Sequence, residues 1–386
     1  MFSRRSASEH QENALYAALG AMREAGTPYL DLTVSNPTVV GLRGPSASLA
    51  QILANVDCSK YEPAPLGMPS AREAAAQHFR QLGVALPSEQ VLLTASTSES
   101  YSFLFNLLCD AGDEVLIPAP SYPLFEYLAR FANVTATPYR LAYDGAWHID
   151  FDSLTSAVTP RTRAVVLVNP NNPTGSYVSK QEWLRLAQFG LPLISDEVFA
   201  RYPLIDDAQR PLSALCVLQG AEVPLFVLDG LSKYAGLPQL KLGMMAYACP
   251  SALGDELHHR LEMIADTFLS VSTPVQAALP QLLRHGKTTH DHIQERISTN
   301  YGTLRTLVRD SAATLLRAEG GWSAVLQLPQ TLSEQAWVLR LLQERRVLVQ
   351  PGWFFDFATE PFVVVSLLTP PDDFARGVQA ILGAVG

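Results

Sequence analysis

The feature that most constrains this chain is the alternation of short apolar runs with longer segments of helical periodicity. Continuous apolar runs of this length are typical of strands that are buried on both faces of a parallel or mostly parallel sheet. Such runs occupy residues 91–96, 113–120, 163–170, 191–197, 225–230 and 242–248. The intervening segments at 99–112 and 179–190 have helical spacing and end at glycine. The pattern predicts a βαβ architecture for the middle of the chain.

Chain length predicts more than one lobe, because 386 residues exceed an ordinary single domain. We expect residues 1–45 to form an N-terminal arm and a segment of the small domain, 46–270 a large α/β domain, and 271–386 a small α+β domain. Ser6 and Glu9 have capping-box spacing before a helix that reaches about Glu24. We expect that helix to pack on the C-terminal lobe.

Composition excludes several classes of protein. The net charge of -9 is spread without a basic block, which argues against nucleic acid or an anionic membrane as the main partner. No run has the length and apolarity of a membrane span, and the N-terminus shows no secretory signal, so we expect a cytoplasmic protein. The four cysteines have no CxxC spacing, and His290 and His292 point to different faces of a helix, so no metal site is expected.

Polar residues follow four of the predicted strands, at the edge where parallel sheets bind ligands. Asn172 lies in the segment NPNNPTG, Asp196 in SDEV and Lys233 in LSK, while Thr97 and Ser98 open a helix. A helix N-terminus with hydroxyl groups suits a phosphate. A lysine at the rim of an apolar pocket can form a Schiff base, and a buried carboxylate can keep a pyridine nitrogen protonated. Together these groups meet the demands of pyridoxal 5'-phosphate.

The ordered set NPNNPTG, SDEV and LSK resembles the fold-type I pyridoxal-phosphate enzymes, specifically the class I/II aminotransferases. Further landmarks of that family extend over nearly the whole chain, namely LDLTVSNPT, KYEPAPLGMPSAREAAAQHF, PAPSYPLF, SVSTPVQAAL and VLVQPGWFF. The resemblance implies a large domain with a mostly parallel sheet flanked by helices, plus a smaller α+β domain. It also implies a transaminase that moves an amino group from an amino donor to an oxo acceptor through pyridoxamine phosphate.

Roles for individual residues follow from the resemblance alone. Lys233 would be the internal aldimine lysine and the proton shuttle, and Asp196 would pair with the pyridine nitrogen. Asn172 would donate to the 3'-oxygen of the ring, and Tyr122 would stack on its face. The phosphate ligands would be Thr97, Ser98, Ser232 and Lys241.

Two further residues concern the partner subunit and the substrate. The tyrosine that matches Tyr61 reaches the phosphate of the other subunit in this family, which implies a homodimer with shared sites. Asn36 lies in the N-terminal turn that covers the substrate in relatives, and we take it as a candidate substrate ligand.

Each of these residues also has an ordinary structural explanation. Asp196, Thr97 and Ser98 could act only as helix or turn caps, and Asn172 between two prolines could be a turn residue. Tyr122 could be a packing residue, and Tyr61 a surface anchor. Their place in the ordered set is what favours the functional interpretation.

Four positions depart from the family pattern. Phe199 replaces a tyrosine that donates to the ring oxygen, Lys241 replaces a phosphate-binding arginine, and Gly230 stands where serine is common. Val364 stands where an arginine clamps the substrate α-carboxylate, and no Arg or Lys lies between Arg346 and Arg376. Another cation, such as Arg201 or a partner residue, takes the carboxylate, or the substrate carries none at that place.

Two alternatives to the transaminase remain. A lyase, racemase or synthase would use Lys233 and Asp196 equally well. A non-catalytic sensor would carry a DNA-binding module, and the sequence shows neither a preceding helix-turn-helix pattern nor a basic face. The sequence does not identify the donor, the acceptor or the pathway.

Overall fold

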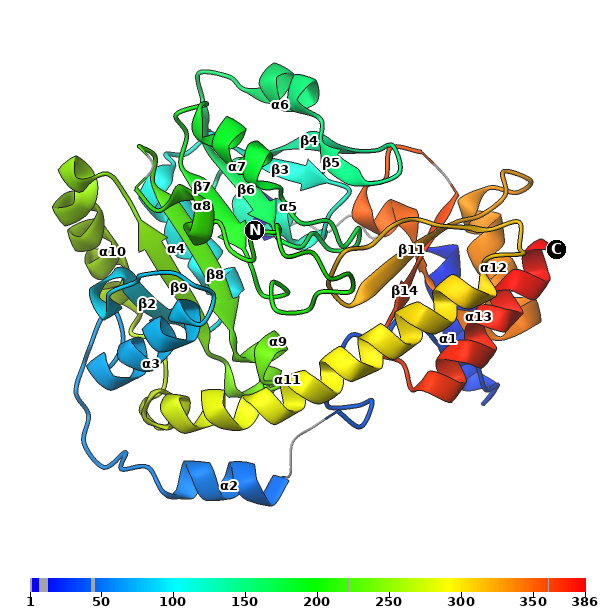
Figure 1. Ribbon diagram of the computed structural model, residues 1–386, viewed down its shortest axis with the longest axis horizontal. Coiled ribbons are helices and arrows are strands. Elements are labelled where there is room, and N and C mark those ends of the chain that lie inside the picture. Colours follow the sequence, from blue (N-terminus) through cyan, green and yellow to red (C-terminus); the bar gives the residue numbers. More distant parts are fainter. Residues whose placement is uncertain (1, 7–12, 43–45, 221, 360) are drawn as a thin grey trace.

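Two bodies joined by one long helix make up the molecule (Figure 1). The computed structural model describes residues 2–6, 13–42, 46–220, 222–359 and 361–386. The joining helix is α11 (Thr273–Leu307), which contacts α2 (Ser46–Ala54) and α3 (Pro69–Arg80) at one end and α13 (Pro371–Val385) at the other.

The larger body is built on one twisted sheet, which has eight strands among the described residues. The strands lie in the order β2 (Val91–Thr94), β9 (Gly243–Ala248), β8 (Leu225–Gly230), β7 (Leu193–Asp196), β6 (Thr162–Val168), β3 (Glu114–Ala119), β4 (Thr135–Tyr143) and β5 (Trp147–Ile149). The pairs from β8 to β4 are parallel, whereas β9 is antiparallel to both neighbours and β5 is antiparallel to β4. The six apolar runs therefore correspond to six of these strands.

Two strands of this sheet, β4 and β5, were not predicted from the sequence. β4 has few buried side chains and contains Pro138, so it lacks the continuous apolar run that identified the other strands. It is nevertheless paired along its length with β3, from Glu114–Thr135 to Ala119–Arg140. Its hydrophobic signal was weak because most of its side chains are exposed or only half-buried.

Helices cover both faces of this sheet. One face packs against α3, α6 (Phe151–Ala157), α7 (Lys180–Ala187), α8 (Leu215–Leu218) and the first half of α11. The other face packs against α4 (Thr97–Leu108), α5 (Leu124–Phe131) and α10 (Gly254–Phe268). A sheet covered on both faces explains why its central strands are apolar throughout.

The smaller body is α+β. Its sheet has the order β10 (Thr314–Leu315), β11 (Ser323–Gln327), β14 (Phe362–Ser366) and β13 (Gln350–Pro351), all antiparallel. A short parallel pair joins β1 (Leu30–Asp31) to β12 (Val347–Leu348). α12 (Glu334–Arg345), α13 and the end of α11 share one apolar core with this sheet.

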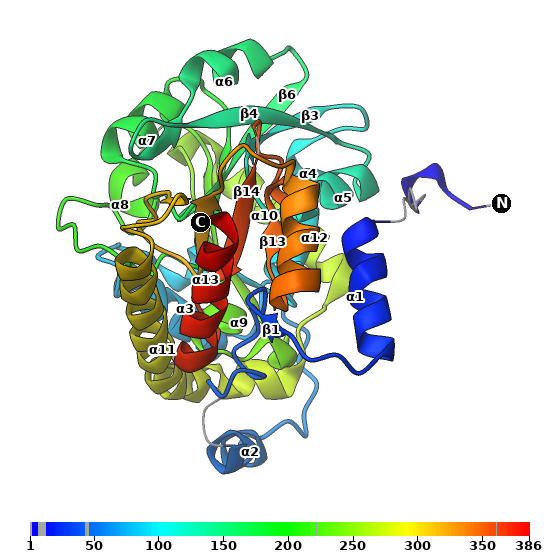
Figure 2. The same cartoon turned by 90° about the vertical axis from the view of Figure 1, so that its right-hand side faces the viewer.

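The first long helix, α1 (Ala14–Glu24), packs on α12 of the smaller body (Figure 2). Its buried residues Leu15, Leu19 and Met22 belong to the core of that body. The helix is capped by Asn13, whose side chain accepts from the Leu15 amide, so the predicted cap at Ser6 was wrong. Ser6 lies in a separate 3-10 turn, and Glu9 lies outside the described residues.

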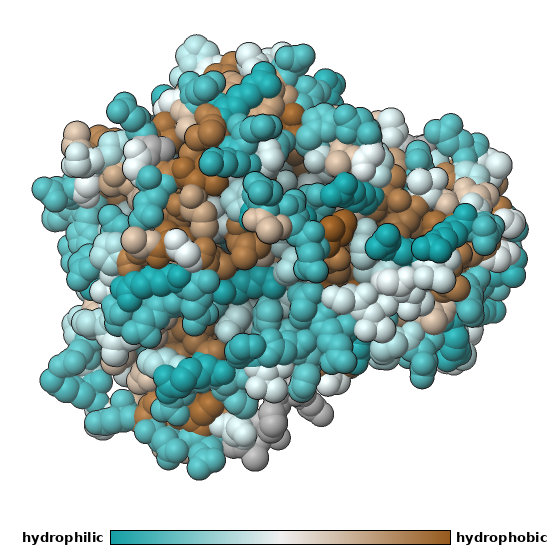
Figure 3. All heavy atoms as spheres, in the orientation of Figure 1, coloured by the Kyte–Doolittle hydropathy of each residue, from teal (hydrophilic) through white to brown (hydrophobic). Residues whose placement is uncertain are grey.

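Hydrophilic side chains cover much of the face drawn in Figure 3, with smaller apolar areas between them. Within the described part of the chain, no helix combines the length and apolarity needed to cross a membrane.

Candidate active site

The Lys233 segment begins where β8 ends. Gly230 is extended, and a Cβ there would lie 2.9 Å from the Leu242 carbonyl oxygen. The Leu231 amide donates to that same carbonyl at 3.1 Å. The close approach of β9 explains glycine at this position, and α9 (Leu231–Tyr234) starts immediately after it.

Lys233 points its amine into an aromatic pocket. Its Nζ lies 5.4 Å from the ring centroid of Phe199 and 5.2 Å from that of Trp322. Burial lowers the pKa of Lys233, and the nearby Asp196 carboxylate partly opposes that shift. A lowered pKa increases the fraction of neutral amine, which is the nucleophile for a carbonyl group.

Asp196 ends β7 and lies in the sheet next to the Lys233 strand. Its Oδ2 accepts from the Tyr101 hydroxyl at 3.2 Å, and its Oδ1 accepts from the Val198 amide at 3.3 Å. Burial raises its pKa to about 6 despite these hydrogen bonds. No Lys or Arg of the described residues forms an ion pair with it, so a protonated pyridine nitrogen would supply the missing cation.

The N-terminus of α4 follows β2 at the same edge. Ser96 is the N-cap and accepts from the Glu99 amide at 3.2 Å, while the Glu99 carboxylate accepts from the Ala95 amide at 2.6 Å. Thr97 and Ser98 are the first two helical residues and are partly buried. The helix end is therefore fixed by its own cap, with two hydroxyl side chains available for a phosphate.

Asn172 lies on the loop after β6. Its Oδ1 accepts from the Ser323 hydroxyl at 3.3 Å, so the large body contacts the small body here. The loop is held because the Gly175 carbonyl accepts from the amides of Glu319 and Gly320, both at 2.9 Å. Gly175 has φ +72°, and a Cβ there would lie 2.6 Å from the Gly320 oxygen.

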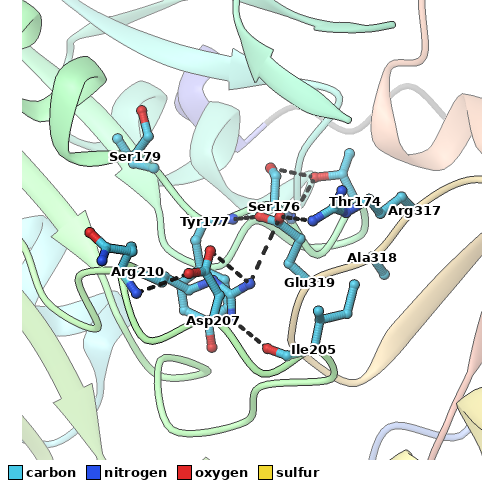
Figure 4. Close-up of polar contacts among 12 residues, drawn as sticks. Thr174, Ser176, Tyr177, Ser179, Ile205, Asp207, Arg210, Arg317, Ala318 and Glu319 are labelled. Atoms are coloured by element: carbon cyan, nitrogen blue, oxygen red, sulfur yellow. Dashed lines mark hydrogen bonds and ion pairs between the residues drawn. The ribbon is translucent and has the colours of Figure 1, made fainter. Parts of the chain in front are cut away.

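Charged residues reinforce this contact, as Figure 4 shows. Arg210 is nearly buried, with its guanidinium 3.9 Å from Asp207 and 3.8 Å from Glu319. Its guanidinium also lies 4.6 Å from the ring centroid of Tyr177, on the loop that carries Asn172. These contacts hold the Asn172 loop against the segment that precedes β11.

A cavity of about 840 Å³ opens between the two bodies, and its lining does not include Lys233, Asp196 or Thr97. Tyr122 and Asn172 both line it, and Tyr122 has 48% of its surface exposed. The small body contributes further polar residues, namely Ser323, Gln350 and Ser366. The structure thus brings Tyr122 and Asn172 to one cavity, with Ser323 adjacent to Trp322 of the Lys233 pocket.

The remaining candidate residues are less tightly gathered. Ser232 precedes Lys233 and is partly buried, whereas Lys241 is exposed at φ +52°. Tyr61 is 70% exposed and lines a separate small pocket with residues such as Thr273. Asn36 is exposed, and its side chain accepts from the Thr38 amide and hydroxyl, so it forms a local turn.

Val364 is buried in β14, where it packs with Val325, Phe355 and Phe362. Arg201, which we considered as a replacement cation, does not line the cavity. Its guanidinium donates to the His78 carbonyl and lies 5.5 Å from the Tyr234 ring centroid. Among the described residues lining the cavity, Arg140 is the single Lys or Arg, and it is paired with Asp150 at 2.8 Å.

Sequence reasoning missed three side chains of the site. Tyr101 lies one helical turn after Thr97, and this i to i+4 spacing could have identified it. Trp322 and Ser323 come from the start of β11, which is distant in sequence from the Lys233 segment. No local pattern indicates that contact, because the tertiary fold creates it.

Comparisons with known proteins identify the family and the fold. The model of the family described as aminotransferase class I and II matches residues 28–381. Nicotianamine aminotransferase 1 of Oryza sativa is 31% identical over 249 residues, which are 62% of this chain and 49% of that protein. Glutamate-pyruvate aminotransferase AlaA of Escherichia coli is 29% identical over 267 residues, covering 68% of this chain and 65% of that protein. The chain thus spans about half to two-thirds of the length of these curated relatives.

Solved structures resemble the whole chain. An aminotransferase from Escherichia coli has a TM-score of 0.86 at 22% identity, covering 100% of this chain and 98% of that one. Alanine aminotransferase from Pyrococcus furiosus has a TM-score of 0.85 at 22% identity, covering 100% and 99%. These neighbours confirm the predicted fold class, and the family match confirms the predicted resemblance. The chain belongs to the class I and II aminotransferase family.

Proposed function

We propose that this protein is a pyridoxal-phosphate-dependent aminotransferase that acts as a homodimer. The observation that carries the proposal is the convergence of Lys233, Asp196, Asn172 and the N-terminus of α4 at the carboxyl edge of one sheet. The family match and the names of the relatives support the same activity.

Each chemical group of the cofactor has a candidate ligand among these residues. The N-terminus of α4 would hold the phosphate with Thr97 and Ser98, joined by Ser232 and Lys241. Asp196 would bind the pyridine nitrogen, Asn172 the ring oxygen, and Tyr122 the ring face. When bound, the cofactor would supply an electron sink for the bonds of the substrate carbon.

The protein's own residues would orient the substrate and move its proton. Lys233 would attach the cofactor at rest and, once displaced by the amino donor, would take the proton from the substrate carbon through Nζ. Asp196 would stay ionised beside the protonated ring nitrogen. Phe199 and Trp322 would exclude water from Nζ, which lowers the pKa of the amine.

The substrate would not be clamped by an arginine of this chain at the Val364 position. The relatives are named for different substrates, so their names do not select one for this protein. We propose an amino donor that either lacks an α-carboxylate or presents it to a cation outside the described cavity lining. The same observation keeps a lyase, racemase or synthase as the second candidate, because these reactions need Lys233 and Asp196 alike.

The test is the visible spectrum of the cofactor-loaded protein, titrated with separate panels of α-amino acids, ω-amino acids, amines and amino sugars. Conversion to the pyridoxamine form by one panel supports transamination and identifies the donor class. Product formed without that conversion favours the second candidate. Lys233→Ala should reduce turnover by at least about a thousandfold, whereas an active Lys233→Ala protein contradicts the role of Lys233.

A further inference from the structure

Two ionisable side chains are paired in the core behind β8. His78 of α3 and Asp229 of β8 have 2% and 5% of their side chains exposed, and Nε2 lies 3.0 Å from Oδ2. A carboxylate has no hydrogen to donate, so the imidazole Nε2 donates this hydrogen bond. The pair lies on the sheet face that packs against α3 and α11, opposite to Tyr101.

The Asp229 carboxylate also holds the start of the Lys233 segment. Its Oδ1 accepts from the Gly230 amide at 2.7 Å. Gly230 is the junction between β8 and α9. The Asp229 carboxylate therefore links that junction to His78 of α3. The link lies four residues before Lys233.

His78 contacts the other end of the same segment. Its ring packs edge-on against Tyr234, with the centroids 4.5 Å apart. Tyr234 directly follows Lys233, and the Tyr202 hydroxyl donates to the Lys233 carbonyl at 2.7 Å. One buried pair therefore contacts the chain on both sides of Lys233.

These anchors matter because α9 has only four residues. A helix of a single turn has no stability of its own, so its position depends on tertiary contacts. An ionisable pair in the core costs desolvation free energy, and apolar side chains of similar size would fill the space without that cost. The pair is better explained by the geometry it imposes than by the stability it adds.

We propose that Asp229 is a positioning residue for Lys233, and that His78 holds the Asp229 carboxylate in place. The inference rests on the proposed role of Lys233 as the residue that binds the cofactor. Asp229 touches neither the cavity nor the reacting atoms, so its effect would pass through Gly230 and the start of α9.

Two variants of Asp229 test this role. Asp229→Ala removes both hydrogen bonds, while Asp229→Asn keeps an oxygen for Gly230 and an amide that can bond to His78 in its other tautomer. The control is His258→Ala, which removes a hydrogen bond of 2.7 Å to Tyr247 on the opposite face of the sheet. His78→Phe keeps a ring against Tyr234 and breaks the bond to Asp229, and it replaces Asp229→Ala if that protein does not fold.

The first measurement is the pKa of the Lys233 amine in the cofactor-free protein. The chain has five lysines, so reductive methylation with ¹³C-formaldehyde gives a simple NMR spectrum, and Lys233→Ala assigns the signal. We expect the lowered pKa of Lys233 to move toward its ordinary value in Asp229→Ala and to stay unchanged in Asp229→Asn and His258→Ala. The second measurement is kcat, which should fall by roughly 10 to 100-fold in Asp229→Ala at little changed KM, and by less than about threefold in Asp229→Asn.

Two results would overturn the inference. If Asp229→Ala lowers only the melting temperature and leaves both kcat and the Lys233 signal unchanged, the pair is merely structural. If Asp229→Asn is as impaired as Asp229→Ala, charge and not position is the property that matters. Borohydride reduction of the loaded parent protein, followed by peptide mapping, tests the proposed function separately, because cofactor attached elsewhere than Lys233 refutes that function whatever the variants do.

Discussion

At the scale of single residues, the proposed role of Asp196 requires a buried carboxylate that lowers the stability of the fold. Its carboxyl has an ordinary pKa of 3.8, which burial raises to about 6 in the folded protein. Between these values the folded state keeps a proton that the unfolded state has lost, so the free energy of unfolding falls as the pH rises. Above about pH 6 the full penalty of a buried, unpaired charge remains.

Asp196→Asn should therefore stabilise the cofactor-free protein at about pH 8 and have little effect near pH 4. The same change should reduce turnover by orders of magnitude, because a neutral amide does not keep the ring nitrogen protonated. Thermal melting at the two pH values and steady-state kinetics measure both effects. Equal melting temperatures of parent and variant at the higher pH would contradict the stability argument.

The adjacent carboxylate provides a matched control. Glu197 is buried, and burial raises its pKa to about 7, but its Oε1 accepts from the Ala214 amide and the Ser195 hydroxyl, away from the cavity. Glu197→Gln should also stabilise the protein at high pH while leaving turnover within about threefold of the parent. A comparable loss of turnover in both variants would show that the effect is not specific to Asp196.

Single residues at strand ends were predictable because each lies at the end of an apolar run or within three residues after it. Lys233, Asp196 and Asn172 all follow this rule, and the structure places them at the same edge of the sheet. The sequence could not show that Trp322 lies over Nζ or that His78 pairs with Asp229. Those contacts join segments separated by 89 and 151 positions, and no periodicity spans such distances.

At the scale of elements, β9 packs closely against the start of α4, which is the proposed phosphate end of the site. Gly243 opens β9, and a Cβ there would lie 2.7 Å from the Thr94 hydroxyl and 3.1 Å from the Thr97 amide nitrogen. The same Cβ would lie 2.9 Å from the backbone carbon of the N-cap residue Ser96, so the helix N-terminus itself would have to shift. The glycine is therefore required by space and not by its φ angle.

Gly243→Ala should destabilise the protein by about 1–3 kcal/mol and weaken cofactor binding by at least about tenfold, because it displaces Thr97. Gly20→Ala in α1 is the control, since its Cβ would meet nothing within 4 Å. That change should stabilise the protein by about 0.5–1 kcal/mol without changing cofactor affinity. Urea denaturation and cofactor titration test both, and unchanged affinity in Gly243→Ala would refute the link between β9 and the phosphate end.

Elements differ in how well the sequence predicted them. Strands buried on both faces gave continuous apolar runs, so β6, β7 and β8 were located to within a few residues. β4 was missed because few of its side chains are buried and because it contains Pro138, so it has no continuous apolar run. The start of α1 was predicted too early. Ser6 and Asn13 both have capping side chains, and the structure uses Asn13.

At the scale of the whole molecule, contacts within one chain do not account for the proposed role of Tyr61 at the phosphate. It is 70% exposed, and it lies outside the lining of the cavity that holds Asn172 and Tyr122. In the proposed homodimer it would reach the phosphate of the partner's cofactor. The site would then be composite, with Lys233 from one protomer and Tyr61 from the other.

Mixing two inactive variants tests this arrangement directly. Lys233→Ala and Tyr61→Ala should each have little activity as pure dimers. Refolded together, half of the dimers should be hybrids, and each hybrid should contain one site with both native residues, which restores about a quarter of the parent's activity. If Tyr61 instead serves the site of its own protomer, every hybrid site lacks one of the two residues, and mixing should give only the average of the two variants. The hybrid measured alone, purified with two different affinity tags, separates these outcomes because only a shared site gives it about half of the parent's activity.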